Sequence, residues 1–466
     1  MYLITSFRAN RKGPGDATES PHIGVYFPAE KGAPMSDFDT VLHPDHVVPI
    51  MPRRQVLSDH SVALKGGQIA AILPRSEALL IDVEHTRLPG CVLMPGLINL
   101  HCHSAMSLLR GYADDLSLMT WLQNYIWPTE REFISPDFVR DGSDLALADL
   151  LLGGTTTLAD HYFFPDVTAA SIDRAGLRGL LTFPVIDVET GWARNAEEGI
   201  NRGLALRDDY RDHDRIDIGF GPHSTYMVKE ETLAKVAVLA DELEASVQIH
   251  LHESREEVLT AVERTGVRPV DLLERLGLLG PRTQCVHMTA MGEQDMDTVA
   301  KYGAHVVHCP RSNLKLGVGI CPVQRLLDRG INVALGTDGA ASSNRLSMLA
   351  EMQTASLIGK TQHGDPTAVD AWTALEMATL AGARALGKED TLGSIEPGKV
   401  ADLIAIDVSA LPLSPNHNLA SSLVYATSGQ EVSWSWVAGK PLMQEGRLLT
   451  LDYTDLMTRA ERWSQQ

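Results

Sequence analysis

The chain has 466 residues, of which 60 are acidic and 40 basic, so its formal net charge is −20 at pH 7. A surface this acidic repels phosphate backbones and anionic lipids, so we expect neither a nucleic-acid partner nor a membrane partner. No apolar run approaches the roughly 18 residues that a membrane-spanning helix needs. The five cysteines lie in apolar contexts without a Cys-x-x-Cys pair, which indicates free thiols in a reducing compartment and a cytoplasmic protein.

Both ends of the chain have the character of short strands. Residues 1–35 contain Gly, Pro and Ala without clear periodicity and lack the continuous apolar core of a signal peptide, so we expect a flexible N-terminal extension. Beyond it, apolar runs flank the pair Gly66-Gly67, a pattern typical of a hairpin. Period-two alternation returns near the C-terminus. We expect residues 36–92 and 388–450 to form one small β-sandwich domain.

Between these segments, short aliphatic runs alternate with helical patterns. One helical pattern has Ser135 and Pro136 as its N-cap and first residue, and Gly153-Gly154 as its stop. Short aliphatic runs are typical of strands buried on both faces. Eight are present, at 97–101, 155–160, 179–186, 216–221, 246–251, 283–287, 304–308 and 332–337. The sequence therefore predicts an α/β fold, a (β/α)8 TIM barrel over residues 93–387.

The first run of the barrel ends in two histidines, His101 and His103. Residues i and i+2 of a strand point to the same face, so the two imidazoles project together from the strand's end. Such a pair forms half of a divalent-metal site, and imidazole suits zinc or iron. The alternative is a pair of partly buried, hydrogen-bonded histidines, and only distant residues that complete a coordination sphere decide against it.

Four further aliphatic runs end in residues that bind metals or move protons, namely His223, the group His250, His252 and Glu253, His287, and Asp338. Functional residues at the carboxyl ends of successive parallel strands are the pattern of TIM-barrel enzymes. Glu253 is placed to carry a proton between a water and an aromatic nitrogen. The alternative is a solvated acid at the head of a helix, where negative charge is favoured. His161, His305 and His308 are interpreted as structural.

Seven stretches carry a family resemblance, at 101–106, 108–116, 127–130, 221–224, 250–253, 308–316 and 336–342. They resemble the amidohydrolase superfamily and, within it, the 5-methylthioadenosine/S-adenosylhomocysteine deaminases. The resemblance covers the chain from about residue 40 to about residue 445. It implies the same architecture, a barrel with a small β-sandwich built from both chain ends.

The resemblance also implies a metal centre. Its ligands are His101, His103, His250 and Asp338, and its metal is one Zn²⁺ per chain, with Fe²⁺ or Mn²⁺ as alternatives. Three neutral nitrogens and one carboxylate leave the metal positive enough to acidify a bound water, provided that one position stays open.

Two points of this assignment rest on neighbouring residues. Binuclear relatives usually have a carboxylated lysine at the end of the fourth strand, where this chain has Gly221-Pro222-His223, so one metal is expected rather than two. His250 and His252 share a strand face, so spacing does not separate them, whereas the family motif matches His250.

Catalytic roles follow in the same way. The resemblance assigns protonation of the substrate's ring nitrogen to Glu253. His287 hydrogen-bonds the attacking water and Asp338 helps to orient it. Taken alone, His287 is better interpreted as a satisfied core histidine.

The substrate contacts are expected from Glu130, Arg194 and His223, together with Glu253 and Asp338. Glu130 matches a Trp-Pro-x-Glu motif that contacts the ribose hydroxyls in the family, and a carboxylate is a good acceptor for a diol. A surface acid is the alternative. His223 matches a substrate-binding histidine. Arg194, placed by approximate position only, is a planar fork for a substrate carboxylate or else a solvated loop arginine.

Two other features concern the pocket. The apolar positions between Leu116 and Trp127 are typical of core packing, and part of them are candidates for its roof. Ser343 and Arg345 stand where relatives usually have Asn and Asp, which affects the choice of substrate but not Asp338.

The resemblance implies hydrolytic deamination of adenine nucleoside thioethers. The substrates are 5′-methylthioadenosine and S-adenosylhomocysteine, with adenosine as a further candidate, and the products are 5′-methylthioinosine, S-inosylhomocysteine and ammonia. A homo-oligomer, a dimer or a tetramer, is expected. One alternative is a deaminase or chlorohydrolase of another purine or an s-triazine, which has no ribose for Glu130 to hold. The other is a non-catalytic barrel scaffold, which would not need the metal ligands or Glu253.

Overall fold

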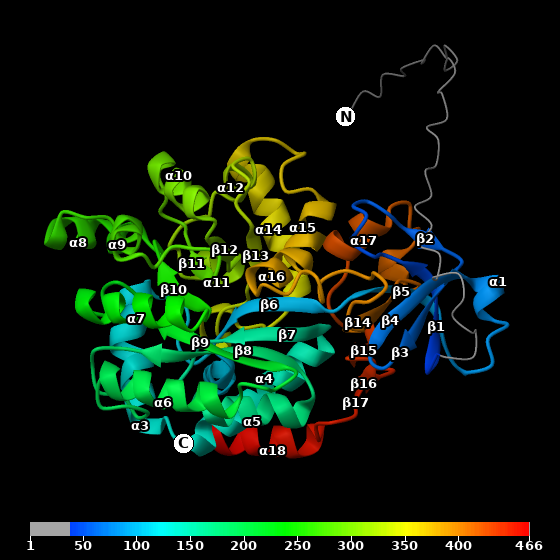
Figure 1. The fold of residues 1–466 in the computed structure, drawn as a ribbon, viewed down its shortest axis with the longest axis horizontal. Helices are drawn as coiled ribbons and strands as arrows, with labels where there is room; N and C mark the ends of the chain where they lie inside the picture. Colours follow the sequence, from blue (N-terminus) through cyan, green and yellow to red (C-terminus); the bar gives the residue numbers. More distant parts are fainter. Residues whose placement is uncertain (1–37, 466) are drawn as a thin grey trace, which may run out of the picture.

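The computed structural model describes residues 38–465, and the predicted N-terminal extension lies outside these residues. The described chain has two parts, a barrel of strands surrounded by helices and a separate sheet beside it (Figure 1). The sheet contains strands from both ends of the chain, with the barrel inserted between them. This arrangement confirms the predicted architecture.

The barrel has eight strands, paired in chain order and all parallel: β6 (Leu97–Cys102), β7 (Thr155–Asp160), β8 (Arg178–Val185), β9 (Ile216–Pro222), β10 (Val247–Leu251), β11 (Thr283–His287), β12 (His305–His308) and β13 (Val333–Leu335). Polar contacts join the first strand to the end of the last. The Asn99 side chain exchanges two hydrogen bonds with Thr337, of 2.8 and 2.9 Å, and the backbone N–H of Asp338 donates to the carbonyl of His101. The end of the last strand therefore lies beside the histidine pair of the first.

Helices follow the strands. The α-helices are α1 (Arg75–Ala78), α2 (Leu118–Trp121), α3 (Trp127–Phe133), α4 (Pro136–Leu152), α5 (Pro165–Ala175), α6 (Ala196–Asp209), α7 (Glu230–Glu242), α8 (Arg255–Thr265), α9 (Pro269–Leu276), α10 (Glu293–Tyr302), α11 (Pro310–Lys315), α12 (Val323–Leu327), α13 (Ala340–Ser343), α14 (Met348–His363), α15 (Ala371–Met377), α16 (Leu380–Ala385), α17 (Leu419–Tyr425) and α18 (Tyr453–Ser464). Shorter turns are the 3-10 helices η1 (Ser104–Leu109) and η3 (Leu411–Leu413) and the π-helical segment η2 (Leu122–Ile126).

Helix α4 begins and ends at the residues that the sequence predicts. Its N-cap Ser135 accepts a hydrogen bond from the N–H of Phe138, Pro136 is its first residue, and Gly153 follows its last.

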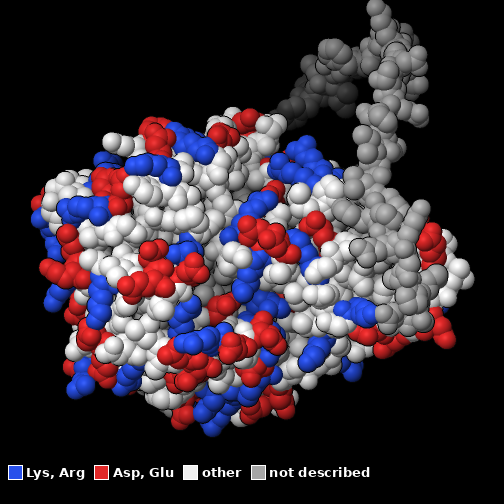
Figure 2. Space-filling view, in the orientation of Figure 1, with Lys and Arg blue, Asp and Glu red and all other residues white. Residues whose placement is uncertain are grey.

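No helix among residues 38–465 is long and apolar enough to cross a membrane. Basic and acidic side chains are interspersed over the face shown in Figure 2, with no extended basic area on it.

The second sheet has nine strands: β1 (Thr40–Val47), β2 (Leu57–Ser58), β3 (His60–Lys65), β4 (Gln68–Pro74), β5 (Glu84–Pro95), β14 (Leu403–Asp407), β15 (Val432–Val437), β16 (Lys440–Gln444) and β17 (Arg447–Leu448). All pairs are antiparallel except β1 with β5. β3 and β4 form the predicted hairpin across Gly66-Gly67.

The β3–β4 turn of this sheet lies against the turn between β15 and β16. The carbonyl of Gly67, in the β3–β4 turn, accepts from the N–H of Ala401, whose carbonyl accepts from Gly439 beyond β15. Gly67 has a positive φ of +78°, and a Cβ there would lie 2.7 Å from the carbonyl oxygen of Ala438. Only glycine therefore fits this contact without displacement of the backbone.

The terminal helix α18 was not predicted. It returns to the barrel and packs on α4, where Arg459 pairs with Asp141 and Asp144, and the indole N–H of Trp463 donates to Asp141. Trp463 also meets Phe138 edge to face, with ring centroids 5.3 Å apart. The chain end is thereby attached to the barrel and not to the sheet that precedes it.

Candidate active site

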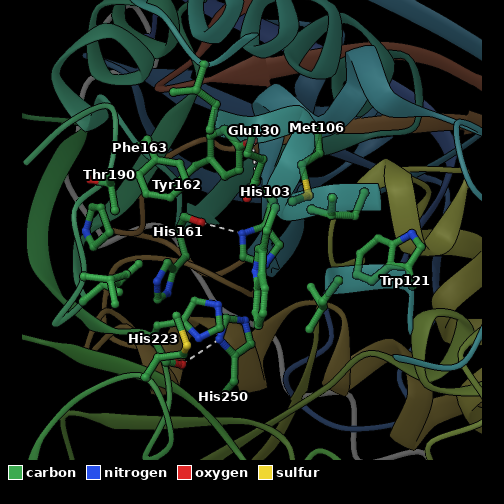
Figure 3. A pocket seen from close by; sticks show the side chains of 18 of the residues that line it. His103, Met106, Trp121, Glu130, His161, Tyr162, Phe163, Thr190, His223 and His250 are labelled. Atoms are coloured by element: carbon green, nitrogen blue, oxygen red, sulfur yellow. Dashed lines mark hydrogen bonds between the residues drawn. The ribbon is translucent and has the colours of Figure 1, made fainter. Parts of the chain in front are cut away.

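A cavity of about 730 Å³ opens at the carboxyl ends of the barrel strands (Figure 3). Its inner end is polar and contains histidines and acids from several strands. Its outer wall is largely apolar and comes from the segment that contains α2, η2 and α3, with Leu118, Trp121, Leu122, Ile126 and Trp127. Part of the predicted apolar segment thus borders the cavity. A mostly apolar pocket with a few convergent polar groups is typical of a small-molecule site.

The two histidines of the first strand are both held through Nδ1. His101 Nδ1 lies 2.7 Å from the side-chain oxygen of Gln248, and His103 Nδ1 lies 2.5 Å from the carbonyl of His161. The amide nitrogen of Gln248 donates to two other oxygens, which leaves its oxygen as the acceptor toward His101. Each ring therefore carries its proton on Nδ1 and presents an unprotonated Nε2.

His250, from β10, meets this pair in the same way. Its Nδ1 bonds to the carbonyl of His223 at 2.8 Å, and its Nε2 lies 3.3 Å from Nε2 of His101. Two unprotonated nitrogens at this separation repel each other unless a cation lies between them. The tautomers fixed by Gln248 and His223 thus favour a bound metal.

Asp338 adds a carboxylate from just beyond β13. Its Oδ1 is 3.5 Å from His101 Nε2 and 3.3 Å from His103 Nε2, while Oδ2 accepts from the hydroxyls of Ser312 and Ser342. Burial alone would raise its pKa, but contact with the neighbouring imidazoles, His101 first among them, holds the pKa of Asp338 well below its usual value. The group is an anion at neutral pH.

The donor separations fit zinc. Zn–N bonds of about 2.0–2.1 Å in a tetrahedral site place neighbouring donors about 3.3–3.4 Å apart. Three separations, from His101 to His250, from His101 to Asp338 and from His103 to Asp338, are 3.3 to 3.5 Å and agree with this value. Two overlapping groups could hold an ion, one of His101, His103 and Asp338 and one of His101, His250 and His287. His101 belongs to both groups, so the four expected ligands fall into two overlapping groups, with His287 in one of them.

The structure also separates His250 from His252. β10 ends at Leu251, and His252 has a left-handed φ of 50°, which breaks the strand alternation. Its Nδ1 bonds to the carbonyl of Ala290, and its Nε2 accepts from the N–H of Val270. The expectation that the two rings share a strand face is therefore wrong, and His252 is occupied in holding a neighbouring loop.

Glu253 is buried in the cavity wall beside His287. Burial and the charge of Asp338 raise the pKa of Glu253 to about 8. Its Oε1 lies 3.7 Å from His287 Nε2, and His287 Nδ1 bonds to the side-chain oxygen of Asn313 at 2.9 Å. Glu253 is not a solvated helix-head acid, and at neutral pH it carries a proton that it is able to donate.

Glu130 also lies in the cavity wall, on α3. The hydroxyl of Tyr162 donates to its Oε1 at 2.8 Å, and burial raises the pKa of Glu130 to about 7 against the opposing effect of that bond. The alternative of a freely solvated surface acid does not describe this residue. His223 lines the cavity next to His250, with ring centroids 4.9 Å apart.

Arg194 lies apart from the other expected site residues and does not line the cavity. Its side chain is 80% exposed and bonds to Glu198 at 2.7 Å, one helical turn further along. The spacing of Arg194 and Glu198 in the sequence already allowed this i,i+4 pair.

Sequence reasoning missed other residues of the site. Tyr162 and Asn313, which bond to Glu130 and His287, and Gln248, which orients His101, were not singled out. Gln248 faces the same side as His250, two residues along β10, so strand alternation was a usable signal. His161, interpreted as structural, lies in the cavity wall.

The Amidohydrolase family matches residues 92–442, and the chain belongs to that family. Within it, the chain is 48% identical over 430 residues to a 5-methylthioadenosine/S-adenosylhomocysteine deaminase of Teredinibacter turnerae, covering 92% of this chain and 97% of the relative. It is 38% identical over 433 residues to a 5′-deoxyadenosine deaminase of Methanosarcina barkeri, covering 92% and 98%.

Solved structures of similar proteins have the same fold. An adenosine deaminase from Xanthomonas campestris with bound zinc superposes with a TM-score of 0.91 at 44% identity, covering 93% of this chain and 99% of that one. The atrazine chlorohydrolase TrzN from Arthrobacter aurescens shares the fold, with a TM-score of 0.84 at 22% identity, over 91% of this chain and 99% of that one.

Proposed function

We propose that this protein is a zinc-dependent aminohydrolase that deaminates adenine nucleoside thioethers. Its substrates are 5′-methylthioadenosine and S-adenosylhomocysteine, with adenosine as a further candidate. The observation that carries the proposal is the buried Glu253 beside His287, next to the two overlapping donor groups that share His101. The relatives named above support the choice of nucleoside.

The chemistry divides among the residues. Zinc held by His101, His103, His250 and Asp338 supplies a Lewis acid that lowers the pKa of a water. Glu253 gives its proton to N1 of the adenine ring as the water adds to C6, and takes up the proton that this water loses. It passes that proton to the amino group, the C6–N bond breaks to release ammonia, and the hydroxyl proton returns to Glu253 as the C6 carbonyl forms. His287 Nε2 is free to hydrogen-bond the attacking water, because its Nδ1 is held by Asn313. Burial of the site strengthens each of these interactions.

The rest of the cavity suits a nucleoside with an apolar 5′ group. Glu130 has one oxygen held by Tyr162, and its carboxyl group is available to the ribose hydroxyls. The wall that contains Trp121 and Leu122 is apolar and complements a thioether, which has little hydrogen-bonding capacity. A free base or an s-triazine has no ribose, so it would leave the second oxygen of Glu130 without a hydrogen-bond partner.

An ammonia-release screen tests the proposal. The zinc-loaded protein is offered 5′-methylthioadenosine, S-adenosylhomocysteine, adenosine, adenine, guanine and an s-triazine at equal concentrations. We expect the highest kcat/KM for a nucleoside thioether. A preference for a free base or a triazine would overturn the nucleoside assignment, and release of ammonia from none would favour the scaffold alternative.

We further propose that the protein acts in the cytoplasm as a homo-oligomer, a dimer or a tetramer. The described cysteines are free and buried, which suits a reducing compartment. Light scattering coupled to size-exclusion chromatography measures the mass directly, and a monomer at micromolar concentration would contradict the oligomer.

A further inference from the structure

His161 occupies a distinctive place in the cavity wall. It directly follows β7, where its backbone N–H donates to the carbonyl of Cys102 and its own carbonyl accepts from His103 Nδ1. Both ends of its peptide are therefore fixed to the strand that contains the histidine pair. Its imidazole borders the cavity between His103 and His223 and is only 3% exposed (Figure 3).

Neither ring nitrogen of His161 has a hydrogen-bond partner within residues 38–465. Among the described histidines, only His161 has both nitrogens buried and unpaired, since His308 has one. An unpaired buried polar group costs free energy, and such groups in a native protein usually meet a ligand, an ion or a water. An unpaired imidazole that borders a substrate-sized cavity points to a ligand contact.

The metal is not that ligand. His161 belongs to neither group whose donor atoms lie within 4.8 Å of one another. Its ring is nevertheless close to the metal group, with centroid separations of 5.2 Å from His250 and 5.8 Å from His103. The side chain therefore faces the space where the reacting ring must lie without joining the coordination sphere.

The barrel determines which edge of that ring it faces. β7 is the second strand in the eight-stranded order and β11, which contains His287, is the sixth, so the two lie across the barrel from each other. Glu253 and His287 act at N1 and C6 of the purine. In adenine, N1 and N7 are the two ring acceptors on the edge that carries the C6 amino group, whereas N3 lies away from it. A ring with N1 at Glu253 therefore leaves N7 as the acceptor near C6 for a group beside the metal histidines, where His161 lies.

We propose that His161 is a further substrate-binding residue that donates a ring N–H to N7 of the purine. The proposal rests on the deamination proposed above and specifies which edge of the substrate ring is recognised. No protein atom fixes the tautomer of His161, so the imidazole is free to present a donor to this acceptor.

The test compares methylthioadenosine with its 7-deaza analogue, in which N7 is replaced by C–H. Wild type is expected to lose roughly 10- to 100-fold in kcat/KM on the analogue, mainly through KM, the range for one buried polar group left without its partner. His161→Leu should lose a similar factor on methylthioadenosine and no longer distinguish the two substrates. His161→Gln, which keeps a donor, should recover part of the discrimination.

Two readouts separate recognition from structural damage. His161→Leu removes unpaired polar atoms, so its melting temperature should equal or exceed that of wild type, and its zinc content should stay unchanged. Calorimetric binding of methylthioinosine, the product, should weaken in this variant without any turnover. As a matched control, His308→Leu, outside the cavity, should keep the wild-type ratio between the two substrates.

The outcomes are distinguishable. Equal turnover of both substrates by wild type, discrimination that survives in His161→Leu, or loss of zinc from that variant would each overturn the role of His161 and leave the deamination intact. Failure of wild type to deaminate any nucleoside would overturn the proposed function, and the N7 contact with it.

Discussion

Two buried clusters of histidines, one in the second sheet and one in the barrel, are built in opposite ways. In the sheet, His43 bonds through Nδ1 to the hydroxyl of Ser61 and through Nε2 to His85, both at 2.7 Å, and His85 bonds onward to the carbonyl of Ile81. Every ring nitrogen in that cluster has a protein partner. It is complete without any ligand.

In the barrel cluster, by contrast, several buried polar atoms lack a protein partner. The Nε2 atoms of His101 and His250 face each other at 3.3 Å, Glu253 is buried without a cationic side chain beside it, and His161 has no partner. His43 is as buried as the barrel histidines, so burial of a histidine does not by itself indicate a function. What distinguishes the site is unsatisfied hydrogen-bonding capacity directed at one cavity.

Removal of the metal should have the largest effect on activity and should affect only the barrel cluster. We expect about one zinc per chain by elemental analysis. Chelation should abolish deamination and lower the melting temperature, because the opposed nitrogens of His101 and His250 lose their common partner. An ion present at 1,000 times its Kd contributes about 4 kcal/mol to stability. Two metals per chain at full activity, or turnover by the metal-free protein, would contradict this expectation.

The substitution Glu253→Gln should have the next largest effect on turnover. Gln keeps the shape of the side chain but cannot carry a proton, so turnover should fall roughly 10²- to 10⁴-fold, the usual contribution of general acid–base catalysis. Zinc content is the control and should not change. Activity within a few-fold of wild type would mean that another group moves the proton.

The pH profile sharpens this prediction. With a pKa of about 8, Glu253 is protonated at neutral pH and loses its proton above that value. Wild-type kcat should therefore fall as the pH rises beyond about 8, toward tenfold per unit. The residual activity of Glu253→Gln should lack this decline, because Gln does not titrate.

Glu130→Ala should have a smaller and more selective effect. Loss of the hydrogen bonds to the ribose should lower kcat/KM for methylthioadenosine by about 10- to 100-fold, the range for bonds to a charged group. Hydrolysis of adenine, if it is measurable, should barely change. Wild type should discriminate against the 2′-deoxy analogue, and the variant should not. A wild type that ignores the missing hydroxyl would refute the ribose contact.

The smallest effect on activity is expected from the sheet cluster. His43→Leu leaves the Ser61 hydroxyl and Nδ1 of His85 without their partner, which should cost about 1–3 kcal/mol of unfolding free energy. Denaturant melts measure this loss, while kcat/KM for methylthioadenosine should equal that of wild type. A fall in kcat/KM at unchanged zinc content would mean that the two clusters are coupled.

Sequence patterns predicted those features that depend on local periodicity. Aliphatic runs located the barrel strands, and His101 and His103 follow directly from the two-residue period. Period reasoning was wrong at His252, because a single left-handed residue ends the strand alternation. Periodicity also does not predict contacts between residues that are distant in the sequence. The hydrogen bond from Tyr162 to Glu130 and the absence of a partner for His161 therefore became visible only in the structure.

The terminal helix α18 has a consequence for the order in which the chain is synthesised. All four proposed metal ligands have been translated by Asp338, well before the last strands of the sheet. Trp463, three residues from the end, packs in the apolar cluster that includes Met106 and Trp121 of the cavity wall. A chain that lacks α18 would therefore keep every proposed metal ligand but lose a residue that packs against the apolar wall of the cavity.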